Sequence, residues 1–369
     1  MQFSIHPRIS DCESLGAFLD QWQVGSQDLI ITNEYVVSPH LSGKALPCEV
    51  LYQEKYGAAA EPNDEMIDAM LDAVQGKPFS RIIAIGGGTV IDIAKLFVFG
   101  GHYNCAEIFA KGAELERKCK LLIIPTTCGT GSEVTGISIV EFKKRNTKLG
   151  LAVPALFADE AVLIPAMLAT LPYQVFATSS IDALIHSVES FVSPKANAFT
   201  QAIGRASIEK ILEGYQALAA TGERALPKDM TAFLLASTMG GIAFGNAGCA
   251  AVHALSYPLG ANYHIPHGKA NYMVFEAVFQ MYKELGVDLS LLENLLATVL
   301  VCDKADVWSE LFSLLEKILP NQSLSAVGAD SAKCVEMARS VIENQQRLLV
   351  NNPIPLSQEQ INQIYQRCL

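Results

Sequence analysis

The chain has 369 residues, of which 50% are hydrophobic and 18% are charged, and its formal net charge at pH 7 is −11. This length predicts two domains with substantial cores, and the apolar composition favours a homo-oligomer, which we expect to be a dimer. The longest basic run is only Lys143–Arg145. An acidic chain of this kind offers no basic tract suited to a phosphate backbone, so we expect no nucleic-acid partner.

Short β-type runs alternate with helical patterns over the first half of the chain. The predicted strands are 28–32, 50–52, 81–85 and 120–124, and the predicted helices between them include 64–74 and 90–95. Strands joined by crossover helices predict an α/β domain with a doubly wound parallel sheet.

Long apolar-periodic segments follow Leu171-Pro172 and predict helices. These segments are 174–192, 198–220, 229–256, 269–285, 306–318 and 331–348. We therefore expect an α/β domain over 1–173 and an all-α domain over 174–369, with the boundary near 170–178 and a ligand cleft between the two.

Two further segments bear on the compartment. Met230–Gly268 contains no Asp, Glu, Lys or Arg, but it is rich in Gly, Ala and Ser and is interrupted by Pro258 and Pro266. We expect a buried helix followed by a polar loop, not a membrane span. The stretch Met1–Arg8 has no signal-peptide pattern and the nine cysteines form no Cys-x-x-Cys pair, so we expect a cytoplasmic chain without a disulfide framework.

A turn of three glycines, Gly86-Gly87-Gly88, joins the predicted strand 81–85 to a helix start at Thr89. Backbone without side chains can approach a phosphate closely, and the helix N-terminus favours its negative charge. Thr89 and Asp92 have the spacing of a capping box. The motif is not Gly-x-Gly-x-x-Gly, and a tight turn that binds nothing explains it equally well.

A second loop, Pro125–Val134, follows the next predicted strand and supplies Thr126, Thr127 and Thr130. Such residues also occur in loops simply because they tolerate turns. Two such loops at the carboxyl ends of neighbouring parallel strands nevertheless favour a nucleotide site, because open α/β sheets bind nucleotides there.

Asp182 and His186 lie four residues apart and therefore on one face of a helix. Alone, this pair indicates no more than a hydrogen bond. His253 and His267 add two imidazoles, and three nitrogens with one carboxylate oxygen suit Fe²⁺ or Zn²⁺. A divalent ion held there would stabilise an alkoxide from which hydride departs.

Four ordered motifs resemble the iron-dependent, or group III, alcohol dehydrogenases. They are Gly86-Gly87-Gly88-Thr89-x-x-Asp92-x-x-Lys95, Pro125-Thr-Thr-x-Gly-Thr-Gly-Ser-Glu133, Asp182-Ala-Leu-x-His186, and His253-Ala-x-x-x-Pro258 with Pro266-His267-Gly268. The resemblance implies an N-terminal dinucleotide-binding domain, a C-terminal helical metal-binding domain and a hydride-transferring enzyme that uses NAD, with NADP not excluded. It implies metal ligands at Asp182, His186, His253 and His267. The expected cofactor contacts are Asn33, Gly86, Gly87, Gly88, Thr89, Asp92, Thr126, Thr127, Thr130 and, on a following hairpin, Lys148.

Strings outside these motifs, such as Tyr52–Gly57 and Gln345–Asn352, resemble the subgroup that interconverts 4-hydroxybutyrate and succinate semialdehyde. A carboxylate substrate needs a cationic or multi-donor anchor, because a buried unpaired charge is costly. The candidates for this anchor are Lys269, Tyr257, His264, Asn262 and Arg347.

The chain departs from the family pattern at two positions. Tyr257 stands where many members carry a histidine, so Tyr257 and His264 are the candidate catalytic residues. His264 is the candidate proton relay, although a structural hydrogen bond explains it as well. Asn33 stands where an Asp in other members selects NAD. The rival interpretations are a diol or general short-chain alcohol dehydrogenase of the lactaldehyde or propanediol type, a lyase similar to dehydroquinate synthase, and a nucleotide-binding protein without catalysis.

Overall fold

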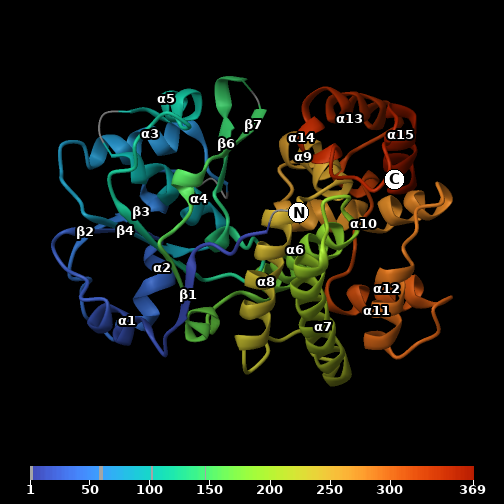
Figure 1. Ribbon diagram of the computed structural model, residues 1–369, viewed down its shortest axis with the longest axis horizontal. Coiled ribbons are helices and arrows are strands. Elements are labelled where there is room, and N and C mark those ends of the chain that lie inside the picture. The colour runs from blue at the N-terminus through green and yellow to red at the C-terminus, as the bar shows by residue number, and fades with distance from the viewer. Residues whose placement is uncertain (1–2, 58–60, 101–102, 146) are drawn as a thin grey trace. The chain divides into compact units, whose positions relative to one another are not determined.

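The computed structural model describes residues 3–57, 61–100, 103–145 and 147–369. They form two compact units (Figure 1). The sheet unit comprises Ile5–Leu171 with Lys228–Leu234, and the helical unit comprises Pro172–Pro227 and Leu235–Leu369 with residues 3–4.

The sheet unit contains a six-stranded sheet in which every neighbouring pair of strands is parallel. In spatial order the strands are β1 (Arg8–Asp11), β8 (Glu160–Leu163), β5 (Lys120–Pro125), β4 (Arg81–Gly86), β2 (Asp28–Thr32) and β3 (Glu49–Tyr52). The antiparallel pair β6 (Ile137–Phe142) and β7 (Thr147–Ala152) stands apart from this sheet. The predicted parallel sheet is confirmed, whereas β1 and β8 were not predicted.

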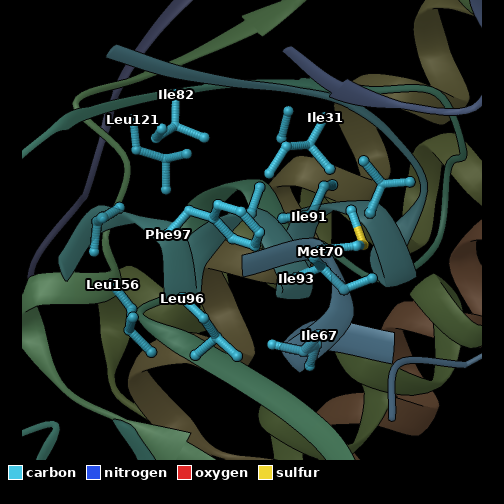
Figure 2. Close-up of a cluster of buried hydrophobic side chains, with 14 of the residues drawn as sticks. Ile31, Ile67, Met70, Ile82, Ile91, Ile93, Leu96, Phe97, Leu121 and Leu156 are labelled. Carbon is cyan, nitrogen blue, oxygen red and sulfur yellow. The ribbon is translucent and has the colours of Figure 1, made fainter. Parts of the chain in front are cut away.

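The central strands are apolar on both faces because helices and connecting chain bury them on both sides. Leu29, Ile82 and Leu121 are neighbours in register across β2, β4 and β5, and all three are fully or almost fully buried. Figure 2 shows this face of the sheet packed against side chains of α3 (Asp64–Ala73) and α4 (Gly88–Leu96). The other helices of this unit are α1 (Leu15–Gln21), α2 (Glu34–Val37) and α5 (Cys105–Lys111).

Helices make up the second half of the chain. They are α6 (Tyr173–Val192), α7 (Ala198–Thr221), α8 (Thr231–Ala247), α9 (Ala251–Tyr263), α10 (His267–Glu284), α11 (Ser290–Leu300), α12 (Val307–Ile318), α13 (Ser331–Asn344), α14 (Gln346–Leu349) and α15 (Gln358–Arg367). The sequence predicted most of them but not α11 or α15, and the predicted helix 331–348 is divided at Gln345.

The predicted single helix 229–256 is wrong, because α8 and α9 are separate helices bent by 105° at a short break. Gly248 lies in this break with φ of +83°. A Cβ added there would lie 2.4 Å from the side-chain nitrogen Nδ2 of Asn351. Glycine is therefore required by both backbone conformation and space. No single helix among the described residues is long and apolar enough to cross a membrane, although this bent pair meets the length and composition criteria together.

Candidate functional site

The glycine turn and the loop after β5 lie against each other at the carboxyl ends of β4 and β5. The Thr126 amide donates to the Gly86 carbonyl at 3.0 Å. A Cβ on Gly87 would come within 3.0 Å of the Thr127 side chain, and one on Gly88 within 2.8 Å of that of Thr130. The glycines thus let the two loops form one backbone-rich surface at the N-terminus of α4, which is suited to a phosphate.

The predicted capping box of Thr89 and Asp92 is wrong. Gly87 is the N-cap residue of α4, and it makes no side-chain capping hydrogen bond, so Thr89 already lies within the helix. The Asp92 carboxylate instead accepts hydrogen bonds from Ser132 Oγ at 2.6 Å and the Ile139 amide at 2.9 Å. Asp92 fastens α4 to the second loop and to β6, and its contact with a cofactor stays a prediction.

Lys95 completes this network below the loop surface. Its fully buried ammonium donates to Ser132 Oγ and to the Ile137 carbonyl, both at 2.6 Å. Burial lowers the Lys95 pKa to about 8, against the opposing effect of Asp92 and Glu133. Lys95 of the first family motif therefore stabilises the Pro125–Val134 loop through buried hydrogen bonds.

Two other predicted cofactor residues have local partners. Lys148, on β7, forms an ion pair with Glu61. Asn33 follows β2 and is buried, and its amide donates to Gln53 and Glu54 at 2.9 Å each. Cofactor contact by either residue stays a prediction.

The structure brings the four predicted metal ligands together. One ligand atom from each of Asp182, His186, His253 and His267 lies within 4.8 Å of all the others. The first three side chains are buried and His267 is half-buried. The expected position of His267 in a loop is wrong, because Pro266 is the N-cap of α10 and His267 is the first residue of that helix.

A glycine makes this convergence possible. A Cβ on Gly268 would lie 2.4 Å from the Thr178 carbonyl oxygen and 3.1 Å from Asp182 Cβ. No side chain fits in that space, so the first turn of α10 can lie directly against α6. On the other side, the His186 ring stacks on the rings of Phe244 and His253, with centroid distances of 4.3 and 4.5 Å.

His253 supplies the observation that tests whether a cation fits. Its Nδ1 lies 2.6 Å from Glu189 Oε2, whereas its Nε2 is buried without a hydrogen-bond partner. A buried nitrogen without a partner is costly, and a metal ion would satisfy it. A carboxylate on the far nitrogen is also the usual companion of a metal-binding imidazole, since it fixes the tautomer. The residues present therefore fit a divalent cation.

Asp182 supplies the anionic ligand of the cluster. Its Oδ1 accepts a hydrogen bond of 2.6 Å from Asn271 Nδ2. Burial alone would raise the pKa of Asp182, but the three histidines and Asn271 outweigh it and hold that pKa below its ordinary value. An ionised carboxylate with three imidazoles is a donor set for Fe²⁺ or Zn²⁺.

Comparison with known proteins agrees with this geometry. Residues 10–165 match the model of iron-containing alcohol dehydrogenases, and residues 176–369 match the C-terminal model of the Fe-containing alcohol dehydrogenase family. The chain belongs to the iron-containing alcohol dehydrogenase family. It is therefore a metal-dependent alcohol dehydrogenase, as the sequence motifs predicted.

Relatives cover almost the whole chain. The 4-hydroxybutyrate dehydrogenase of Clostridium kluyveri is 42% identical over 363 residues, which are 98% of each protein. Long-chain-alcohol dehydrogenase 1 of Geobacillus thermodenitrificans is 31% identical over 81% of this chain and 77% of that protein. The crystal structure of sulfoacetaldehyde reductase from Bifidobacterium kashiwanohense in complex with NAD+ has a TM-score of 0.86 at 18% identity, and the match covers 100% of this chain and 98% of that one.

Glu189 and Asn271 were missed as parts of the site of this alcohol dehydrogenase. Besides holding His253, the buried Glu189 carboxylate accepts from the amides of Ala250 and Val252 at the start of α9. It thereby caps α9 and orients the His253 imidazole that this helix carries. The sequence held a signal, since Asp182 and Glu189 are the only charged residues of α6.

Tyr257 lies one helical turn after His253 on α9, and its ring centroid is 6.0 Å from that of His267. Burial raises the Tyr257 pKa, and the positive charge of the Arg347 guanidinium partly offsets that rise. Arg347 lies on α14 and is exposed. This pair is a cationic group beside a half-buried hydroxyl close to the ligand cluster.

The other predicted anchors have different surroundings. Lys269 donates to Gln322 Oε1 at 2.6 Å, and the Asn262 side chain donates to the Pro258 carbonyl at 2.8 Å. His264 is exposed and ends α9 in the left-handed conformation with φ of +53°. The structure does not group His264 with the four ligands among the described residues, and its role as a proton relay stays a prediction.

Proposed function

We propose that this alcohol dehydrogenase transfers a hydride between NAD(H) and the pair 4-hydroxybutyrate and succinate semialdehyde. The convergence of four candidate ligand side chains around His253 Nε2, which is buried without a hydrogen-bond partner, carries the proposal for the chemistry. The relative named 4-hydroxybutyrate dehydrogenase, at 42% identity over 98% of both chains, supports the substrate pair.

The bound ion, its anionic ligand and the supporting carboxylate have different proposed roles in the reaction. A bound divalent ion supplies Lewis acidity, which lowers the pKa of an alcohol hydroxyl and polarises an aldehyde carbonyl. Asp182 contributes a single negative charge, so the loaded cluster keeps a net positive charge. Glu189 holds His253 in one tautomer, and the burial of three ligands excludes water from their side of the site. We propose iron as the resident ion, with zinc as the alternative that the same donors accept.

The backbone surface at the start of α4 is the proposed site of the NAD pyrophosphate. Gly87 and Gly88 remove side chains there, and the amides at the helix N-terminus favour negative charge. Thr126, Thr127 and Thr130 stay the proposed donors from the second loop.

Arg347 is the side chain that we propose for the substrate carboxylate. Its positive charge acts on the Tyr257 hydroxyl, and the Tyr257 ring centroid lies 6.0 Å from that of the His267 ring. A guanidinium binds a carboxylate through two parallel hydrogen bonds. Lys269 is less suitable, because its ammonium is already bound to Gln322.

The rival proposal is an enzyme for neutral alcohols or diols. The 31% identity to a long-chain-alcohol dehydrogenase supports this alternative. Turnover of succinate semialdehyde and of butanal with NADH separates the two. We expect a kcat/KM at least about tenfold higher for succinate semialdehyde, and we expect an Arg347→Met variant to lose that preference while it retains butanal turnover. Equal kcat/KM values in the wild type would overturn the carboxylate substrate, and an absence of NADH oxidation with any aldehyde would favour a lyase.

The metal requirement is tested on the same assay. We expect chelation to abolish turnover and readdition of Fe²⁺ or Zn²⁺ to restore it. Full turnover after exhaustive removal of metal, verified by elemental analysis, would contradict the proposed chemistry.

A further inference from the structure

A carboxylate stands at the same edge of the sheet as the glycine turn. The strands β3, β2 and β4 are parallel neighbours, so their carboxyl ends meet at one edge. Asn33 follows β2, and Glu54 lies in the short 3-10 helix η2 (Gln53–Lys55) that follows β3. The acidic side chain therefore comes from the segment after β3, the strand beside β2.

Hydrogen bonds hold the Glu54 carboxylate in place. Asn33 Nδ2 donates to Glu54 Oε2 at 2.9 Å, and the Glu34 amide donates to Glu54 Oε1 at 2.7 Å. Asn33 is itself fixed, because it is buried and also donates to Gln53 Oε1 at 2.9 Å. Each carboxylate oxygen has two acceptor positions, so both oxygens of Glu54 can still accept a hydroxyl from a ligand.

In the part of the chain that the structure describes, no basic side chain pairs directly with the Glu54 carboxylate. Lys55, the adjacent basic residue, pairs with Glu34 at 3.8 Å and lies over the Tyr52 ring. Among the residues that the structure describes, no ion pair involves Glu54. Glu54 is also half-buried, which limits screening of its charge by water.

We propose that Glu54 selects NAD(H) over NADP(H), by accepting hydrogen bonds from the adenosine ribose hydroxyls and by repelling a 2′-phosphate, and that Asn33 acts as its positioning residue. An acidic side chain at this edge of a dinucleotide-binding sheet hydrogen-bonds the ribose 2′-hydroxyl. A phosphate carries about −1.5 to −2 charges at pH 7, so it meets repulsion at the same place. This inference rests on the proposed use of a nicotinamide dinucleotide, and it transfers the selecting role from Asn33 to Glu54.

Binding of the dinucleotides alone tests the inference, without any assumption about the substrate. Dissociation constants for NADH and NADPH are measured by fluorescence on the wild type, Glu54→Gln and the matched control Glu34→Gln, which removes the neighbouring carboxylate. We expect the wild type to prefer NADH and Glu54→Gln to lower the ratio of the NADPH and NADH constants by about tenfold or more. Glu34→Gln should leave the ratio within about twofold, since its charge is paired with Lys55.

A second variant tests positioning. Asn33→Ala keeps the Glu54 charge but removes its hydrogen bond, so we expect weaker NADH binding and a partial loss of selectivity. An unchanged ratio in Glu54→Gln, or equal binding of both dinucleotides by the wild type, would overturn the inference alone. A wild type that binds neither dinucleotide would overturn the proposed cofactor and this inference with it.

Discussion

The sheet edge beyond β4 and β5 and the ligand cluster on α6, α9 and α10 are built from different parts of the chain. At the sheet edge, the turn works because Gly87 and Gly88 have no side chains, and the opposing loop fills the space. In the cluster, four side chains from three helices converge, and buried polar groups such as Glu189 orient them. A backbone site tolerates changes that preserve its space, whereas a side-chain site depends on the identity of each ligand and of its supports.

The largest expected effect comes from the loss of a ligand. His267→Ala should lower kcat by about 10³-fold or more, because the ion loses a ligand that no other described side chain replaces. Turnover and bound metal per chain are measured together, with His40→Ala as a control that removes an imidazole from the sheet unit. Normal metal content and normal turnover in His267→Ala would contradict the proposed role of His267 as a metal ligand.

Loss of a support should cost less than loss of a ligand. Glu189→Gln keeps the shape of the side chain but removes the charge that holds His253, so we expect metal affinity to fall about 10–100-fold. Saturating metal should restore most of kcat. Ser190→Ala, next to it on α6, is the control for disturbance of the helix. If Glu189→Gln bound metal as tightly as the wild type, Glu189 would serve only to cap α9.

At the sheet edge, the expected effect depends on space. Gly88→Ala should weaken NADH binding about tenfold, because its Cβ would lie 2.8 Å from Thr130 Cγ2. Thr130→Ser removes that methyl group, so the double variant should recover most of the affinity. If Thr130→Ser did not restore NADH binding to Gly88→Ala, the methyl group added at position 88 would obstruct the dinucleotide itself. Its contact with Thr130 would then not explain the weaker binding.

The smallest effect on activity is expected away from both sites, at the buried Glu160 of β8, whose loss should affect stability instead. Burial would raise the pKa of Glu160, but hydrogen bonds from Arg8, Ser10 and Trp22 outweigh it and lower that pKa. A lowered carboxyl pKa stabilises the fold above the unfolded pKa, and the contribution disappears as the pH falls through the folded pKa. Glu160→Gln should therefore cost about 1–3 kcal/mol in the free energy of unfolding at pH 7, and the difference from wild type should shrink below about pH 4. A difference independent of pH would exclude this ionic role, and turnover per folded chain should be unchanged.

The sequence predicted what periodicity and local spacing determine. The isoleucine- and leucine-rich strands β2, β4 and β5 were predicted because each is buried along nearly its whole length. By contrast, β1 has only four residues, most of them exposed, so its pairing with β8 depends on partners distant in the chain. The break between α8 and α9 was missed because Asn351, which leaves no room for a side chain at Gly248, is distant from it in the sequence.

The candidate site shows the same division. The four candidate ligands could be selected from the sequence because histidine is rare in this chain and the family motifs mark each position, and the structure brings their ligand atoms together. The role of Asn33 was harder to assess, because its partner Glu54 follows the neighbouring strand β3 and only the sheet order brings them together. Sequence therefore indicates which side chains do chemistry more readily than which side chains hold them in place.

The position of His253 depends on residues near the end of the chain that hold α9 in place. The break that Gly248 makes before α9 is closed by Asn351, whose side chain donates to the Cys249 carbonyl at 2.9 Å. Farther along α9, the Tyr365 hydroxyl donates to the Leu255 carbonyl at 2.6 Å. Both tethers arrive long after His253 during synthesis, so a ribosome-bound chain that ends before them holds this imidazole less firmly. We therefore expect firm metal binding at this cluster to require the chain through Tyr365.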